Sequence, residues 1–263
     1  MIYKIGSKGD SVRLIQQELI EAGYEIPADG IYGPRTAETI KDWQRKNELE
    51  CDGIAGPATI TVLFGLKPVS GFIGEHITHC AGRSVRYIAI HYTAGSTSAA
   101  GAAYRTRNVF LKRSASADYV VDDATIVQVN PDIRNYYCWA VGDKKNTSGG
   151  GGQLFGTACN KNTVSIEICS NLTRGATDTV PNHSGWFFTE KSVCLALRLT
   201  RYLMVMHDVP MDRVVRHYDI SGKCCPGILG WNNAPSYSTS GAYIGAKSNS
   251  NKWQEFKEAI WRK

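Results

Sequence analysis

The feature that most constrains this chain is a near-repeat close to its N-terminus. The segment DGIYGPRT at 29–36 returns as DGIAGPAT at 52–59. Each copy begins with an Asp-Gly turn, continues with Gly-Pro, and ends with a threonine placed to cap a helix. Two such turns so close together predict a compact unit of short helices.

Apolar residues around the two copies follow the period of a helix. Asp10 can cap a first helix, a second helix follows the first copy, and a short third helix follows the second copy. The sequence thus predicts a small three-helix domain in residues 1–66, with apolar positions Val12, Ile15, Leu19, Ala37, Ile40, Trp43, Ile60, Leu63 and Phe64.

These elements, in this order, resemble the type 1 peptidoglycan-binding domain. The family pattern G-x-x-G-x-x-V-x-x-L-Q stands here at 6–16, with Ile15-Gln16 in the Leu-Gln place. The family's aromatic-Gln pair is Trp43-Gln44, which lies between the two copies of D-G-x-x-G-x-x-T. The resemblance covers about residues 4–65 and implies that peptidoglycan is a binding partner.

Charge and hydropathy bear on where the chain acts. The formal net charge of +6 suits an anionic partner, but the basic residues are scattered, so we expect no nucleic-acid binding. The chain has no run of about 18 apolar residues, which argues against membrane insertion, and no apolar N-terminal stretch typical of a signal peptide. We expect a protein that is made in the cytoplasm and acts on the cell wall after release. Its eight cysteines would then be free thiols, apart from one metal thiolate.

The pattern changes after residue 66. Residues 67–84 are rich in Pro, Gly and Ser, which indicates a linker and an irregular lead-in. From residue 85 to residue 263, strands alternate with helices, which predicts an α/β domain with a central mixed β-sheet flanked by helices. The expected strands are 85–92, 117–122, 125–129, 164–169 and 214–217, the expected helices are 189–207 and 252–261, and the expected loops are 144–159 and 227–251.

Three residues of this second domain could form one metal site. His91 and His217 each end a predicted strand, and Cys225 follows His217 by eight positions. Two imidazoles and one thiolate suit Zn²⁺ and leave its fourth position for water, as in catalytic zinc sites. A single buried histidine or thiol is more often a part of the core, so the prediction depends on the combination.

The segment around Cys225 resembles the H-x-D-x-x-x-K-x-C-P signature of the type 2 N-acetylmuramoyl-L-alanine amidases, the group that includes phage T7 lysozyme and the peptidoglycan recognition proteins. Residues 88–95 resemble the first zinc-ligand strand of that family, and residues 162–167 match its N-[ST]-[IV]-x-[IV]-E strand. Every fixed position of the signature is filled, by His217, Asp219, Lys223, Cys225 and Pro226.

The resemblance implies a role for each polar residue. His91, His217 and Cys225 would bind zinc, which would polarise the scissile carbonyl and activate a water. Lys223, two residues before Cys225 and so on its side of an extended stretch, would stabilise the oxyanion. Glu167 would act as general base or orient the water. The alternatives are a structural salt bridge for Glu167 and a solvated surface position for Lys223.

Some positions depart from the family pattern or are ambiguous. Ala117-Asp118 stands where members carry Tyr-His or Ala-His, and Ala140 replaces a common histidine in the W-H-x-G segment at 139–142. Cys224 offers a second thiol, although the eight-residue spacing selects Cys225. We expect Asp219 to support the ligand loop rather than to contact substrate.

Together the resemblances imply a bacterial cell-wall hydrolase, an endolysin or autolysin, that cleaves the amide between N-acetylmuramic acid and L-alanine. Residues 1–66 would hold the chain on the wall and residues 85–263 would cut it. A non-catalytic peptidoglycan recognition protein is disfavoured because such proteins typically lose the ligand cysteine. A different zinc peptidase would need other ligand spacings such as H-x-H, which does not occur.

Overall fold

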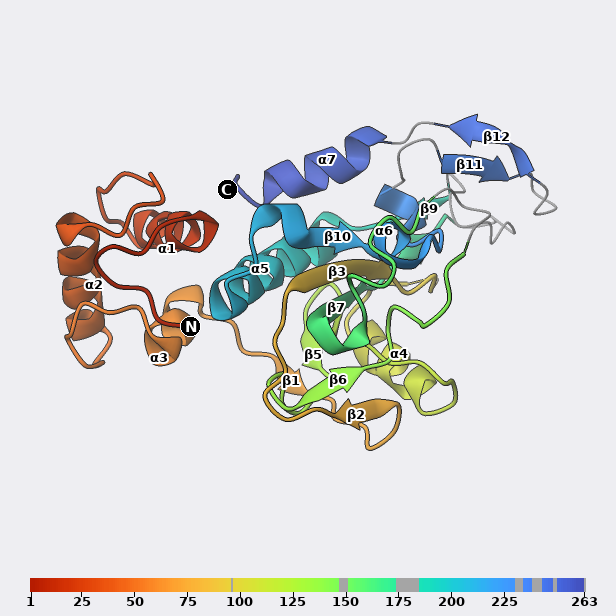
Figure 1. The fold of residues 1–263 in the computed structure, drawn as a ribbon, viewed down its shortest axis with the longest axis horizontal. Coiled ribbons are helices and arrows are strands. Elements are labelled where there is room, and N and C mark those ends of the chain that lie inside the picture. Colours follow the sequence, from red (N-terminus) through yellow and green to blue (C-terminus); the bar gives the residue numbers. More distant parts are fainter. Residues whose placement is uncertain are drawn as a thin grey trace. The chain divides into compact units, whose positions relative to one another are not determined.

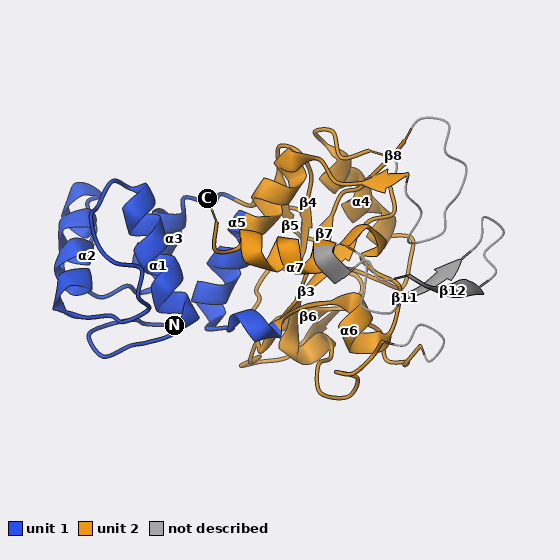
Figure 2. Ribbon diagram, turned by 90° about the horizontal axis from the view of Figure 1, so that it is seen from above, with its two compact units in different colours: residues 1–67, 198–213 blue, residues 68–197, 214–263 orange. Residues whose placement is uncertain are grey.

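The structure, a computed structural model, describes residues 1–95, 97–146, 151–173, 185–229, 234–237, 243–247 and 250–262. The chain forms two compact units, residues 1–67 with 198–213 and residues 68–197 with 214–263 (Figure 2). Within the described ranges, no helix combines the length and the apolar character that crossing a bilayer requires.

The first unit contains the three predicted helices, α1 (Asp10–Glu21), α2 (Pro34–Lys46) and α3 (Pro57–Phe64) (Figure 1). The predicted threonine caps are wrong, because Pro34 and Pro57 already begin the helices two residues earlier. Asp10 is also no cap, since Gly9 precedes the helix as its cap residue without a side-chain hydrogen bond.

One buried glutamine holds each copy of the repeat. The side-chain amide nitrogen donates to the Asp carboxylate, to the carbonyl two residues later and to the Thr hydroxyl at 2.9, 3.0 and 3.1 Å in both copies. The side-chain oxygen accepts from the Gly N–H. The repeat threonines therefore bind a glutamine instead of capping. The partners are Asp29, Gly30, Ile31 and Thr36 for Gln16, and Asp52, Gly53, Ile54 and Thr59 for Gln44.

Residues 198–213, which include the second half of α5 (Glu190–His207), complete the first unit. Thr189, the first residue of the helix expected at 189–207, caps α5, because the Ser192 N–H donates to Thr189 Oγ1 at 3.2 Å. Residues of the N-terminal segment bind the end of this helix and the turn that follows. The hydrogen-bonded pairs are Tyr3 Oη to Val205 O at 2.7 Å, Ser11 Oγ to Asp208 Oδ1 at 2.9 Å, and Met211 N to Asp10 Oδ2 at 2.8 Å.

The second unit is built around the predicted mixed sheet, which is confirmed. Its six strands run in the order β1-β5-β4-β7-β3-β10. The strands expected at 117–122 and 125–129 form the antiparallel hairpin β4–β5, and all other neighbours in this sheet are parallel. The segment 67–84 contributes β1 to one edge. The strands are β1 (Val69–Ser70), β3 (Tyr87–Tyr92), β4 (Tyr119–Val121), β5 (Ile126–Gln128), β7 (Thr163–Ile168) and β10 (Val214–Arg216).

Helices lie on both faces of this sheet. On one face, α4 (Ala102–Phe110) packs through Ala103 and Phe110 on Val120 and Val127 of the hairpin. On the other, Trp253 of α7 (Ser250–Ala259) lies 5.4 Å from the guanidinium of Arg216 in β10. The flanked sheet of the sequence prediction is thus observed (Figure 1).

In the part of the chain that the structure describes, three short strand pairs lie outside this sheet. They are β2 (Ile77–His79) with β6 (Tyr136–Cys138), β8 (Asn171–Leu172) with β9 (Trp186–Phe187), and β11 (Ala234–Tyr237) with β12 (Tyr243–Lys247). The last pair lies in a segment predicted to be a loop from its Ser, Asn and Gly content, so that prediction was wrong for these residues. Of the other expected loop, residues 147–150 lie outside the described ranges.

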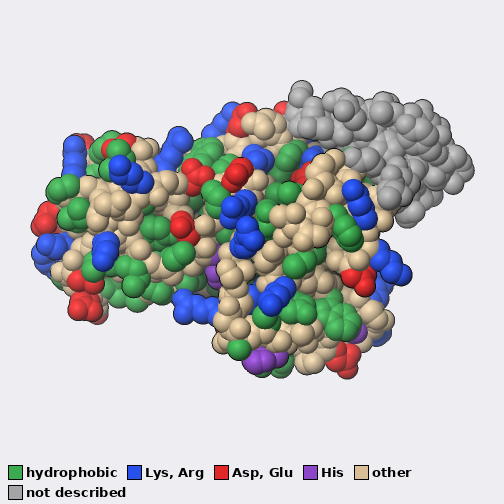
Figure 3. Space-filling view, viewed as in Figure 1, with side chains coloured by type: hydrophobic (Ala, Val, Ile, Leu, Met, Phe, Trp, Pro, Cys, Tyr) green, Lys and Arg blue, Asp and Glu red, His purple; other side chains and the backbone are tan. Residues whose placement is uncertain are grey.

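Charged side chains are mixed on the surface. On the face drawn in Figure 3, Lys and Arg are interspersed with acidic and uncharged side chains rather than gathered over one element. This agrees with the scattered basic residues of the sequence.

Candidate metal centre

His91 and Glu167 lie side by side near the ends of two central strands. They are paired in the register of the parallel strands β3 and β7. Paired residues of neighbouring strands point to the same face of a sheet. His91 is 1% exposed, and its Nδ1 lies 4.0 Å from Glu167 Oε1.

His217 and Cys225 come from the segment that follows β10. His217 was expected to end the strand, but it begins the short helix α6 (His217–Ser221), one residue after β10 ends. The helix stops at Gly222, whose φ of 80° is in the left-handed region that favours glycine. The chain then turns back, and the Tyr218 N–H donates to Cys225 O at 2.9 Å, which holds Cys225 beside His217.

His91, His217 and Cys225 converge on one buried point. The ligand atoms of all three lie within 4.8 Å of one another. Cys225 Sγ is 3.8 Å from His91 Nδ1. Tetrahedral zinc with ordinary bond lengths separates a nitrogen and a sulfur ligand by about 3.6 Å. The group is therefore fit to hold a metal ion.

Side-chain atoms of this site that make no hydrogen bond are available to bind a metal. His217 Nε2 lies 3.2 Å from the carbonyl oxygen of Val141, and His217 Nδ1 has no partner. An imidazole that donates through one nitrogen presents the lone pair of the other to a metal. His91 Nε2 and Glu167 Oε2 are also buried without partners. Three of the four such side-chain atoms found among the described residues thus belong to this site.

Burial sets the protonation of the three candidate ligands. It lowers the pKa of His217 to about 3, helped by the positive charge of Lys223, and lowers the pKa of His91 well below its ordinary value. Both imidazoles are neutral at pH 7, the state that binds metals. Burial raises the pKa of the Cys225 thiol to about 12, so a cation must compensate before the proton leaves.

Glu167, Lys223 and Cys225 line one pocket of about 970 Å³. Burial raises the pKa of Glu167 to about 8, and Lys223 opposes that shift. The backbone between Lys223 and Cys225 is not extended as expected, because the Cys225 N–H donates to Lys223 O at 2.6 Å in a tight turn. Lys223 nevertheless reaches the same pocket as Cys225 and Glu167.

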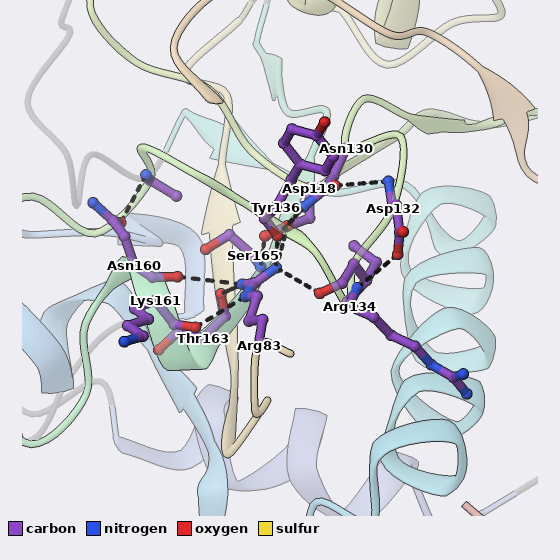
Figure 4. A network of polar contacts seen from close by, with 12 residues as sticks. Arg83, Asp118, Asn130, Asp132, Arg134, Tyr136, Asn160, Lys161, Thr163 and Ser165 are labelled. Carbon is purple, nitrogen blue, oxygen red and sulfur yellow. Dashed lines mark hydrogen bonds and ion pairs between the residues drawn. The ribbon is translucent and has the colours of Figure 1, made fainter. Parts of the chain in front are cut away.

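Asp118, which departs from the family pattern, belongs to a buried polar network (Figure 4). Its Oδ1 accepts from Arg83 Nη1 at 3.1 Å and from Asn130 Nδ2 at 2.6 Å, and its Oδ2 accepts from the Ser165 N–H at 2.8 Å. Arg83 also donates to the carbonyls of Tyr136, Asn160, Lys161 and Thr163. Asp118 is thus a fully bonded structural carboxylate.

Asp219 supports the ligand loop, as expected. It accepts from the backbone N–H of Arg216 at 2.8 Å, and the guanidinium of Arg216 donates to both carboxylate oxygens at 2.7 and 3.0 Å. This clamp holds the residue directly before His217. Sequence reasoning missed Val141, because a backbone carbonyl leaves no side-chain signal. The resemblance at 139–142 marked the segment but not this contact.

Residues 81–228, more than half of the chain, match the family model described as N-acetylmuramoyl-L-alanine amidase. The chain belongs to this family. Residues 8–63 match the model of a peptidoglycan binding domain.

Among the amidase relatives, the N-acetylmuramoyl-L-alanine amidase CwlH of Bacillus subtilis (strain 168) is 34% identical over 152 residues, 56% of this chain and 50% of that protein. The amidase XlyB of the same organism is 32% identical over 144 residues, 54% of this chain and 37% of that protein. The chain thus spans half or less of the length of these relatives. The catalytic domain of XlyA superposes with a TM-score of 0.48 and 23% identity over 74% of this chain and 99% of that domain.

Proposed function

We propose that this protein is a zinc-dependent N-acetylmuramoyl-L-alanine amidase that hydrolyses the bond between N-acetylmuramic acid and the L-alanine of the stem peptide. The observation that supports it most is a buried His-His-Cys group in an amidase-family chain, whose Cys225 lines one pocket together with Glu167 and Lys223. In this proposal the protein meets its substrate in the cell wall, after release from the cell.

In this proposal, His91, His217 and Cys225 hold the zinc ion. When bound, zinc supplies a Lewis acid that polarises the scissile carbonyl and lowers the pKa of a water. Glu167 accepts the proton of the attacking water through its unpartnered Oε2 and passes it to the leaving amine. Lys223, exposed at the pocket, donates to the developing oxyanion.

The products distinguish this reaction from other wall hydrolases. Purified peptidoglycan digested with the zinc-loaded protein should release peptides with a free N-terminal L-alanine and leave the glycan strands uncut. Mass spectrometry of the soluble fraction identifies both. Release of D-alanine or of peptides cut within the stem would instead show a peptidase and would overturn the proposal.

Residues 1–66 bind the wall in this proposal, as their match to the peptidoglycan binding domain supports. The full chain carrying Glu167→Gln should sediment with purified walls. A soluble muropeptide that fills the catalytic pocket should not release it, because the binding surface lies elsewhere in the chain. Complete release by the muropeptide would place wall binding in the pocket and contradict the proposed role.

A further inference from the structure

The pocket that Cys225 of the metal centre lines also carries two arginines. Arg105 and Thr106 of α4, Val109 one turn later and Arg113 just beyond the helix all line the pocket. Residues four apart lie on one side of a helix, so α4 presents a single stripe to the pocket. This stripe belongs to the same cavity as Glu167 and Lys223.

The charge of this pocket is strongly one-sided. Among the residues that the structure describes, the charged lining residues of this pocket are Arg105, Arg113, Lys223 and Glu167, so three cations accompany a single carboxyl group there. Among the described residues, neither Arg105 nor Arg113 has an acidic side chain in hydrogen-bond contact, and both are exposed to solvent. Cations gathered in a concave site raise the local concentration of anionic ligands.

In the proposed mechanism Lys223 acts at the reacting carbonyl, which leaves Arg105 of α4 and Arg113 just beyond this helix to bind other anionic groups. A guanidinium offers a planar pair of N–H donors that matches a carboxylate. The stem peptide supplies such groups. Its second residue is glutamate linked through the side chain, so a free α-carboxylate stands one residue beyond the scissile amide, and the peptide ends in another carboxylate. We propose that Arg105 and Arg113 form a subsite that binds carboxylates of the stem peptide and selects acidic over amidated stems.

The inference rests on the proposed function and is tested with three soluble substrates. All three are N-acetylmuramoyl tripeptides. The first is L-Ala-γ-D-Glu-L-Lys with an amidated C-terminus, and the second has D-isoglutamine in place of D-Glu and the same amidated C-terminus. The third has D-isoglutamine in the second position and a free C-terminus. The proteins are wild type, Arg105→Gln, Arg113→Gln and the control Lys112→Gln. Lys112 is exposed beside the same helix end but does not line the pocket.

We expect the arginine variants to lower kcat/KM about 10- to 100-fold for a substrate whose carboxylate they bind, and to leave the doubly amidated substrate unchanged. Loss on the D-Glu substrate alone assigns the subsite to the second residue, and loss on the free C-terminus alone assigns it to the end of the stem. Equal loss on all three substrates, no loss on any, or the same loss in Lys112→Gln would overturn the proposal.

Binding separates this inference from the proposed function. Calorimetry with the Glu167→Gln chain, alone and combined with Arg105→Gln, measures the Kd of each substrate without turnover. If wild type cleaves none of the substrates, the proposed function fails, while a carboxylate-dependent change in Kd still supports the subsite. A Kd that is the same for acidic and amidated stems overturns the subsite even if cleavage is normal.

Discussion

Two carboxyl groups on one face of the sheet have opposite surroundings. Val120 of β4 is paired with Glu167, and Asp118 precedes Val120 by two residues, so both carboxyl groups lie on this face. Asp118 accepts hydrogen bonds from Arg83, Asn130 and Ser165, whereas Glu167 Oε2 has no partner. A buried carboxylate whose oxygens all accept hydrogen bonds, such as that of Asp118, stabilises the fold. A buried carboxyl oxygen without a partner, such as Oε2 of Glu167, indicates a functional site where a ligand or substrate supplies the partner.

The largest effect should come from the metal group that adjoins Glu167. Cys225→Ser keeps the size of the side chain but removes the thiolate, so zinc content and wall lysis should both fall to background. Chelation of the wild type should do the same, and added Zn²⁺ should restore lysis. Metal analysis by mass spectrometry provides the readout. If the Cys225→Ser chain retains one zinc, another thiol is the ligand, and Cys224 is the first to test.

Asp118→Asn should lower the free energy of unfolding by about 3–5 kcal/mol, because it leaves the buried guanidinium of Arg83 without its counter-charge. The turnover of the protein that remains folded should not change. Urea unfolding and specific activity below the transition measure the two quantities. Asp143→Asn is the matched control, since Asp143 is exposed and should tolerate the same change. A large drop in kcat with normal stability would mean that Asp118 serves the reaction.

Glu167→Gln should lower turnover and leave stability unchanged, the reverse of what we expect for Asp118→Asn. The rate should fall about 100- to 1000-fold, which is typical for loss of one group that acts on the transition state. Zinc should stay bound and Tm should not fall, because the variant removes no hydrogen bond from Oε2. Kinetics on soluble muropeptide, metal content and a thermal melt together check this. Near-normal turnover with a much lower Tm would instead support the structural salt bridge considered for Glu167.

A third carboxyl group, Glu18 of α1, gives a smaller effect that depends on pH. Burial and the neighbouring Glu21 raise its pKa from 4.5 to about 7. The folded state therefore holds this proton more tightly, so the stabilisation is complete below about pH 4.5 and is lost as the pH rises through 7. Relative to wild type, Glu18→Gln should gain about 1 kcal/mol between pH 4.5 and 8. Urea unfolding at both pH values would show no such gain if Glu18 ionises normally.

Much of the architecture could be predicted because its signals are local. The apolar run of β3 and the motif strand β7 identify the centre of the sheet, and the eight-residue spacing links His217 to Cys225. The structure brings these two residues to His91, within 4.8 Å between ligand atoms. Register explains the proximity of Glu167, since it is paired with His91 across two parallel strands.

Other features depend on partners that are distant in sequence. Arg83 lies in a segment predicted to be a linker, and its bond to Asp118 spans 35 residues, so neither residue shows its role alone. The glutamines of the repeat were noted as part of a pattern, but their bonds to Thr36 and Thr59 emerge only when the turns fold back. Arg105 of α4 and Arg113 just beyond it belong to no motif, and only the packing of this helix places them in the pocket.

The discontinuous make-up of the first unit limits how wall-binding modules can be exchanged. A cassette that ends after residue 66 would separate Tyr3 from Val205 and Ser11 from Asp208, and it would leave Tyr3, which is 5% exposed here, open to water. A gene fusion with a single junction, whether it arises in evolution or in the laboratory, therefore cannot transfer this whole unit to another protein. A chimaera that keeps residues 198–213 of the donor, or replaces Tyr3 and Ser11 with residues suited to solvent, should be easier to express in soluble form.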